Sequence, residues 1–241
     1  MDEISPLISI ITVTYQAAKT LEETIKSVLT QESIYEYIII DGGSTDSTVE
    51  IIQRYEQSFS YWISEPDSGI YDAMNKAVLE AKGTWIYFLG ADDQLLPGVL
   101  SDLKDLFKNN ANILLYGNIM YDHGEVFRSQ FSYKTLLHNT IHHQSAFYKR
   151  QLFDKFSFNS SLRIIADYEL NLHIYKEKLP SQYIDKTIAK CTEGGSSYDV
   201  KLSLFETNLV RKSQVSKTIN FLLKNVLTVK YFISYVLLRK I

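Results

Sequence analysis

Four short apolar runs, separated by segments with helical spacing, constrain the fold more than any other feature of this sequence. They are rich in β-branched and aromatic residues, as in strands buried on both faces, and cover 7–14, 37–40, 61–64 and 85–89. Strands that alternate with helices of ordinary length are typical of a mostly parallel, doubly wound sheet. The first hundred or so residues therefore predict an α/β fold.

Local signals place the helices between these runs. Two residue pairs have capping-box spacing before apolar stripes, Thr20 with Glu23 and Ser47 with Glu50. A third helix is expected from about Tyr71 to Lys82, and Gly83 is interpreted as its stop. Beyond Pro97 the pattern loosens, and the expected elements are a helix through 100–107, strands at 113–118 and 183–191, and a helix at 167–174. The chain has no internal repeat or glycine-rich linker, which indicates one body, 1–212, followed by a tail, 213–241.

Charge is distributed unevenly along the chain. The net charge of -3 does not indicate a nucleic-acid binder, but no Asp or Glu follows Glu206 whereas seven Lys and Arg do. The apolar run of the tail is too short and too interrupted by lysines for a membrane span of about 20 residues. A basic amphipathic helix on an anionic membrane surface fits better, and a helix packed on the body or on another subunit is the alternative. The single cysteine, Cys191, rules out an intrachain disulfide and fits a reducing cytoplasm.

Acidic residues follow two of the expected strands. Asp41 closes the second run, and the fourth run ends in Asp92 and Asp93. Ligands bind at the carboxyl edge of open α/β sheets, where these acids would converge and could hold a divalent cation that bridges two phosphates. A solvated turn before Pro97 is the alternative for the adjacent pair. The sequence lacks a P-loop and a GxGxxG motif, so any phosphates would be held by metal and side chains.

Four motifs in order carry a resemblance to a known family. They are IITVTY at 10–15, IIDGGSTD at 39–46, DSGIYDAMNK at 67–76 and FLGADD at 88–93. Together they resemble family 2 glycosyltransferases with the GT-A fold, and most of all bacterial members that build capsular, exopolysaccharide or O-antigen chains. The resemblance covers residue 7 to about 175.

This resemblance implies a Rossmann-like, mostly parallel sheet flanked by helices, with a nucleotide-binding half at about 1–118 and an acceptor half at about 119–212. It implies transfer of one sugar, with inversion, from a nucleotide-diphosphate sugar to a glycan or lipid-linked glycan acceptor. Mg²⁺ or Mn²⁺ would assist. With the basic tail, the expected location is the inner face of the bacterial cytoplasmic membrane, as a peripheral protein, and a homo-oligomer is a further expectation.

The motifs also imply roles for single residues. In the donor site, Asp41 resembles the acid that contacts the nucleotide base, and the other donor-binding positions are Thr14, Tyr15, Asp67 and Asp92. Asp93 resembles the metal ligand. His142 and His143 resemble a histidine near the diphosphate, with an ordinary structural role as the alternative.

Asp167 occupies the place of the catalytic base, with Glu169 as runner-up and a helix cap as the alternative for Asp167.

Three positions depart from the family pattern. Gly90 stands where many relatives have the first Asp of the metal motif, Ala166 replaces a Glu before the base, and Gln16 replaces an Asn. These departures keep a non-catalytic sugar-nucleotide-binding protein as an alternative. A nucleotidyltransferase is a second one, although 9–18 lacks its usual basic, glycine-rich signature. The absence of a Gln-x-x-Arg-Trp motif and of a series of membrane spans makes a processive synthase a poor fit.

Overall fold

The first part of the chain forms four parallel strands, as its alternating pattern predicts. The computed structural model describes residues 5–192 and 199–238, and its strands here run in the order β3-β2-β1-β4. Their bounds are Ile8–Thr14 for β1, Tyr35–Asp41 for β2, Tyr61–Ser64 for β3 and Trp85–Phe88 for β4. All four carboxyl ends lie at one edge of the sheet, where Asp41, Asp92 and Asp93 are found.

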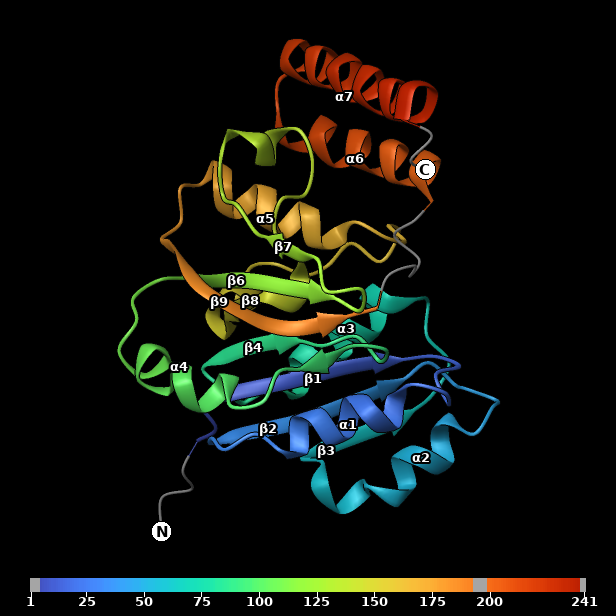
Figure 1. Ribbon diagram of the computed structural model, residues 1–241, viewed down its shortest axis with the longest axis vertical. Helices are drawn as coiled ribbons and strands as arrows, with labels where there is room; N and C mark the ends of the chain where they lie inside the picture. Colours follow the sequence, from blue (N-terminus) through green and yellow to red (C-terminus); the bar gives the residue numbers. More distant parts are fainter. Residues whose placement is uncertain (1–4, 193–198, 239–241) are drawn as a thin grey trace.

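Helices cover both faces of these strands (Figure 1). The helices α1, α2 and α4 pack on one face through a core that includes Ile25, Ile52 and Phe107, and α3 and α5 pack on the other through Met74 and Leu170. Their bounds are Leu21–Leu29 for α1, Thr48–Arg54 for α2, Ile70–Glu80 for α3, Val99–Lys108 for α4 and Ala166–Lys176 for α5. The mixed α/β fold predicted from the sequence is confirmed.

The sheet continues past β4 with strands of mixed direction. Within the described residues it has nine strands in one sheet, with β8 antiparallel to both β4 and β6, and β9 parallel to β6. The remaining bounds are Gln94–Leu95 for β5, Leu114–Tyr121 for β6, Val126–Arg128 for β7, Ala146–Lys149 for β8 and Ser181–Cys191 for β9. The sequence predicted β6 and β9 but missed the three short strands β5, β7 and β8.

At one end of the molecule, three helices are stacked: α5, then α6, then α7 outermost (Figure 1). The helix α6 is Val200–Gln214 and α7 is Lys217–Leu238. Glu206 of α6 is buried, and its carboxylate accepts from the backbone N–H groups of Arg163 and Ile164, just before α5. The position of α5 therefore depends on α6.

Neither predicted capping box is formed, although both helices begin where expected. The side chains of Thr20 and Ser47 make no capping hydrogen bond. At α2 the preceding residue takes this role, because Asp46 Oδ1 accepts from the N–H and the hydroxyl of Thr48 at 3.1 and 2.5 Å. An exposed carboxylate next to the helix start competes with the serine for the same donors.

Gly83 has a different role from the predicted helix stop, because α3 already ends at Glu80. A Cβ atom at Gly83 would collide with the backbone of β1 at Ser9. Its N–H donates to Ser9 Oγ at 2.8 Å and to Glu36 Oε1 at 2.9 Å, which ties the start of β4 to β1 and β2. Glycine is required here by close packing between two chain segments.

Candidate active site

Asp41 organises the loop that follows β2. Its side chain is fully buried, and Oδ2 accepts from Gly43 N at 3.1 Å, Ser44 N at 2.8 Å and Ser64 Oγ at 2.7 Å. The other oxygen, Oδ1, accepts from Ser44 Oγ at 2.5 Å. This carboxylate therefore determines the shape of the 42–45 loop at the carboxyl edge.

Gln16 holds the same loop from the other side. Its backbone N–H donates to Ser44 Oγ at 2.8 Å, its Nε2 donates to Thr45 Oγ1 at 2.9 Å, and its Oε1 accepts from Asp46 N at 3.1 Å. Gln16 has a φ of 53°, a left-handed conformation that asparagine adopts more readily than glutamine. In the sequence, Gln16 stands out only as a departure from the family pattern. It holds the loop through hydrogen bonds to residues 28 to 30 positions further along the chain.

The other predicted donor residues surround this loop. Thr14 ends β1 with a buried hydroxyl that has no hydrogen-bond partner within the described residues, whereas the neighbouring Tyr15 is 65% exposed. Asp67 lies against Gly42, where a Cβ atom would come within 2.6 Å of its Oδ2. The structure thus brings Thr14, Tyr15, Asp41 and Asp67 to the same part of the edge.

Asp92 and Asp93 differ sharply in environment. Asp92 is exposed, and within the described residues its carboxylate makes no hydrogen bond. Asp93 is 3% exposed, and its two oxygens accept from Gln144 Nε2 at 2.5 Å and from Thr192 N at 3.0 Å. A Cβ atom at Gly90 would clash with Asp93 Oδ2, so a larger residue at this position would require the Asp93 carboxylate to move.

Burial and the neighbouring charge of Asp92 raise the pKa of Asp93 to about 6, against the opposing effects of Thr192, His143 and Gln144. The unfolded chain loses this proton near pH 4. Between these values the folded state binds more protons, so the free energy of unfolding falls as pH rises from about 4 to 6. Above about pH 6 this group no longer changes stability.

We expect Asp93→Asn to remove this pH dependence while keeping the fold. The new amide can still accept from Thr192 N, and it can donate to Gln144 Oε1, which is buried without a partner. Urea unfolding at pH 4.5 and pH 7 measures the free energy of unfolding of both proteins. Between these two pH values, the free energy of unfolding of the variant should rise by about 2 kcal/mol relative to that of the wild type. Parallel stability profiles for the two proteins would contradict the assignment.

The two histidines at the start of the short 3-10 helix His143–Ser145 face different surroundings. His142 packs against the rings of Tyr121 and Phe127, and burial together with His143 lowers its pKa to about 4, so it is neutral at pH 7. His143 Nδ1 lies 3.7 Å from Asp167 Oδ2, and its side chain is 29% exposed. His143 therefore lies beside Asp167, with Gln144 next to it bound to Asp93.

Asp167 lies in the first turn of α5, at the end of a chain of hydrogen bonds. Its Oδ2 accepts from Asn139 Nδ2 at 2.8 Å, Asn139 Oδ1 accepts from Asn171 Nδ2 at 3.1 Å, and Asn171 Oδ1 accepts from Tyr148 Oη at 3.0 Å. Its Oδ1 accepts from Tyr168 N at 2.8 Å. Every donor in this chain points toward the carboxylate, which fixes its orientation. The sequence did not indicate Asn139 or Asn171.

Glu169, the runner-up for the base, points elsewhere. Its Oε2 is buried with no hydrogen-bond partner within the described residues, and burial raises the pKa of Glu169. Its backbone carbonyl accepts from Gln214 Nε2 at 3.2 Å, which places Glu169 against α6. Of the two acids, only Asp167 contacts His143.

A metal ion would have few protein ligands in this site. Across residues 5–192 and 199–238, no cluster of three or more His, Cys, Asp or Glu side chains is arranged to hold a cation. The Asp92 carboxylate, which makes no hydrogen bond to the described residues, could bind a cation, whereas Asp93 would need to exchange or share its two hydrogen bonds. Mg²⁺ and similar cations are often held by one or two carboxylates together with substrate phosphates. Asp92 and Asp93 fit a cation only in such a site, where the substrate supplies the remaining ligands.

Comparison with protein families identifies the relatives of this chain. The family model described as "Glycosyl transferase family 2" matches residues 9–169, more than half of the chain. A PGL/p-HBAD biosynthesis glycosyltransferase of Mycobacterium bovis is 31% identical over 204 residues, covering 79% of this chain and 78% of its own. The putative teichuronic acid biosynthesis glycosyltransferase TuaG of Bacillus subtilis is 40% identical over 98 residues, or 39% of each chain.

Solved structures show the same fold at low sequence identity. TarS 1–349 of S. aureus in complex with UDP-GlcNAc superposes with a TM-score of 0.70 at 17% identity, covering 93% of this chain and 72% of that one. The mannosyltransferase PcManGT of Pyrobaculum calidifontis, in complex with GDP-Man and Mn²⁺, gives a TM-score of 0.66 at 16% identity. The match covers 97% of this chain and 71% of PcManGT.

Proposed function

The chain belongs to glycosyltransferase family 2, and on this premise we propose that it transfers a single sugar, with inversion, from a nucleotide-diphosphate sugar to a hydroxyl of a glycan acceptor. The family relationship makes it a transferase of polysaccharide or glycolipid biosynthesis. One observation carries the finer proposal: His143 and Gln144, adjacent in the chain, contact Asp167 and Asp93 respectively. The candidate base thus lies next to the candidate donor site.

The donor would bind along the carboxyl edge. The loop held by Asp41 and Gln16 would receive the nucleoside, with the exposed ring of Tyr15 beside it. Asp67 and Asp92 would contact the ribose and the sugar, because both carboxylates are accessible and can accept from hydroxyl groups. Neighbours of the same fold were solved with UDP-GlcNAc and GDP-Man, which supports a nucleotide-sugar donor here.

Asp92 and Asp93 would hold a divalent cation together with the diphosphate, and such a cation stabilises the charge of the leaving group. The same Asp93→Asn variant tests this role, since an amide loses the charge that a hard cation requires. Calorimetry with UDP should show at least tenfold weaker binding for the variant in the presence of Mn²⁺ and little change in its absence. Equal losses under both conditions would exclude Asp93 as a ligand.

Asp167 would act as the general base. It accepts the proton of the acceptor hydroxyl while that oxygen bonds to the anomeric carbon and the bond from this carbon to the diphosphate oxygen breaks. The electron pair of the broken bond leaves with the nucleoside diphosphate, and the proton remains on Asp167. Attack from the face opposite the leaving group inverts the anomeric carbon.

The reaction product tests the proposal directly. A thermal-shift screen of UDP-, GDP- and dTDP-sugars with Mn²⁺ should first identify a donor, because a ligand that binds the folded state raises its stability. With that donor and an acceptor extract, we expect release of the nucleoside diphosphate. Release of pyrophosphate would indicate a nucleotidyltransferase, and binding without turnover a non-catalytic sugar-nucleotide-binding protein.

From the outer face of α7 we propose that the acceptor is presented at a membrane surface. Leu222, Val226 and Val229 lie on one side of this helix and are more than half exposed, while Asn220 and Leu227 on the opposite side are buried. Lysines flank the apolar stripe, and no acid is present on α7. Within the part of the chain that the structure describes, no helix has the length and hydrophobicity to cross a membrane.

We expect the full chain to bind anionic vesicles at low salt and to dissociate as salt is raised, since each basic residue near such a surface contributes about 1 kcal/mol. The double change Leu222→Ser and Val229→Ser should reduce sedimentation with vesicles at least fivefold, and the exposed Thr228→Ser should not. A different result would assign this face to a contact between subunits: the wild type does not bind vesicles, it is a dimer in light scattering, and the double variant is a monomer.

A further inference from the structure

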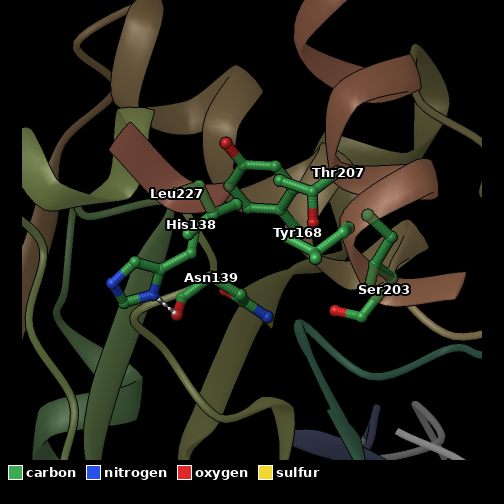
Figure 2. Close-up of a pocket in the computed structure, with 8 residues that line it drawn as sticks. His138, Asn139, Tyr168, Ser203, Thr207 and Leu227 are labelled. Atoms are coloured by element: carbon green, nitrogen blue, oxygen red, sulfur yellow. Dashed lines mark hydrogen bonds between the residues drawn. The ribbon is translucent and has the colours of Figure 1, made fainter. Parts of the chain in front are cut away.

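Two cavities of the protein differ in the charge of the residues that line them. The smaller lies between α5, α6 and α7 and has a volume of about 120 Å³, and its lining residues, six of which are labelled in Figure 2, include no Lys or Arg. The larger has a volume of about 460 Å³ and is lined by three cationic side chains, Lys82, Lys149 and Arg150. We call it the amino-edge groove, and its other lining residues are Ser5, Thr84, Asn110, Ala111 and Gln151.

The amino-edge groove lies at the edge of the sheet opposite the candidate donor site. Thr84 directly precedes β4, and Arg150 directly follows β8, which runs antiparallel to β4. Arg150 N donates to Thr84 O at 3.0 Å, and Trp85 is paired with Lys149, so the two segments meet at this point. A ligand bound here would therefore not occupy the same space as a nucleotide at the carboxyl edge.

The three cations of the groove have no carboxylate partner. Within the described residues, no carboxylate oxygen lies within 4.0 Å of the charged groups of Lys82, Lys149 or Arg150. Lys149 Nζ lies over the Trp85 ring, 4.3 Å from its centre. Burial lowers the pKa of Lys149, and no neighbouring carboxylate of the described residues opposes this shift. Charges that are partly removed from water are normally paired, so these groups are available to an anion from solution.

One carboxylate contacts the chain segment beside the groove. Glu36 is buried, and its Oε1 accepts from Ser9 Oγ at 2.5 Å, Lys82 N at 2.5 Å and Gly83 N at 2.9 Å. Glu36 is not among the residues that line the groove. Its full negative charge, counted against the three cations, still leaves two positive charges, whereas the whole chain has a net charge of -3. The groove is thus a basic region of an acidic protein, and such a region attracts anions.

The lining fits a phosphate group that is attached to a polar molecule. A phosphate monoester carries about −1.5 to −2 charges near pH 7, which matches the net charge of the groove. The guanidinium of Arg150 can donate two hydrogen bonds to one phosphate, and the lysines add point charges. The volume corresponds to roughly 15 water molecules of the liquid, which is more than a phosphate fills. Neutral groups that can bind sugar hydroxyls complete the lining: Ser5, Thr84, Asn110 and Gln151.

We propose that the amino-edge groove binds a phosphorylated sugar, with Lys82, Lys149 and Arg150 around the phosphate and the neutral polar residues around the sugar hydroxyls. This site is separate from the donor site and does not depend on the proposed function. Because the groove joins the starts of several strands to the end of β8, a bound sugar phosphate should also stabilise the folded chain.

Amide NMR shifts of the full chain during titration with glucose 1-phosphate test the groove. EDTA in the buffer removes divalent cations, so that the acidic carboxyl edge does not attract the phosphate. We expect saturable shifts at 82–85, 110–111 and 149–151. Lys149→Met, which keeps an apolar chain over Trp85, and Arg150→Gln should each weaken binding about fivefold or more. Lys176→Gln, which changes an exposed lysine of α5, should leave the affinity within about twofold.

Urea unfolding of all four proteins shows whether each variant is folded, since these surface changes should leave the free energy of unfolding within about 0.5 kcal/mol of the wild type. No saturable shift in the wild type, equal affinity of all variants, or shifts at 41–45 and 90–93 in place of the groove would overturn the inference. Inorganic phosphate should bind about threefold or more weakly than glucose 1-phosphate, because it lacks the hydroxyl contacts. Equal affinity for the two probes would contradict a sugar as part of the ligand.

Discussion

Asp167→Asn should lower turnover at least a hundredfold while donor affinity stays unchanged. A general base contributes about 10² to 10⁴ in rate, and an amide cannot take the proton of the acceptor hydroxyl. Loss of kcat without loss of donor binding is the pattern of an interaction made only in the transition state. Steady-state kinetics, combined with donor titration by calorimetry, measures both quantities.

The variant should fold normally because the hydrogen-bond chain behind Asp167 can reverse its direction. The amides of Asn139 and Asn171 can each flip, and the hydroxyl of Tyr148 can accept as well as donate. The free energy of unfolding should therefore change by less than about 1 kcal/mol. Glu169→Gln is the matched control and should keep most of its activity. Near-normal transfer by Asp167→Asn would remove Asp167 from the mechanism.

Asp41→Ala should abolish nucleotide binding and destabilise the protein together. The substitution leaves four donors, on Gly43, Ser44 and Ser64, without their acceptor. Each unsatisfied buried donor costs about 1 to 3 kcal/mol, and relaxation of the loop should limit the total loss to about 2 to 4 kcal/mol. Urea unfolding and UDP calorimetry, each with and without Mn²⁺, check the two effects.

Asp41→Asn separates the two roles of this carboxylate. An asparagine can accept from the loop N–H groups and donate to the Ser44 hydroxyl, so it should restore most of the stability. Weak UDP binding by this stable variant would indicate direct contact between Asp41 and the base. The exposed Glu50→Gln serves as control. Unchanged UDP binding by Asp41→Ala would contradict the assignment of the 42–45 loop to the donor.

The parallel half of the fold could be predicted because its information is local. Strands such as β1 and β2 are continuous apolar runs, and each acid at a strand end is visible as a break in such a run. The direction of a parallel sheet then places Asp41 and Asp93 at one edge without further knowledge. The helices α3 and α5 were likewise predicted to within a few residues.

The remaining features depend on contacts between distant residues. The strand β8 has only four residues and is identified by antiparallel pairing with β4, whose paired residues lie 60 to 64 positions earlier. Gln144 and Asn139 look like ordinary loop residues until folding brings them to Asp93 and Asp167. The buried Asp93 likewise accepts a hydrogen bond from the backbone N–H of Thr192, directly after β9 and 99 positions along the chain.

Binding of the donor along the carboxyl edge can be followed by the amide NMR shifts of the labelled protein during titration with UDP and GDP. We expect the largest shifts in four segments: 14–16, 41–45, 67–69 and 90–93. The opposite edge has a cavity of about 460 Å³ lined by Lys82, Lys149 and Arg150, which could attract a nucleotide by charge alone. Shifts confined to the residues around that cavity would place the nucleotide at the opposite edge and contradict the proposed donor site.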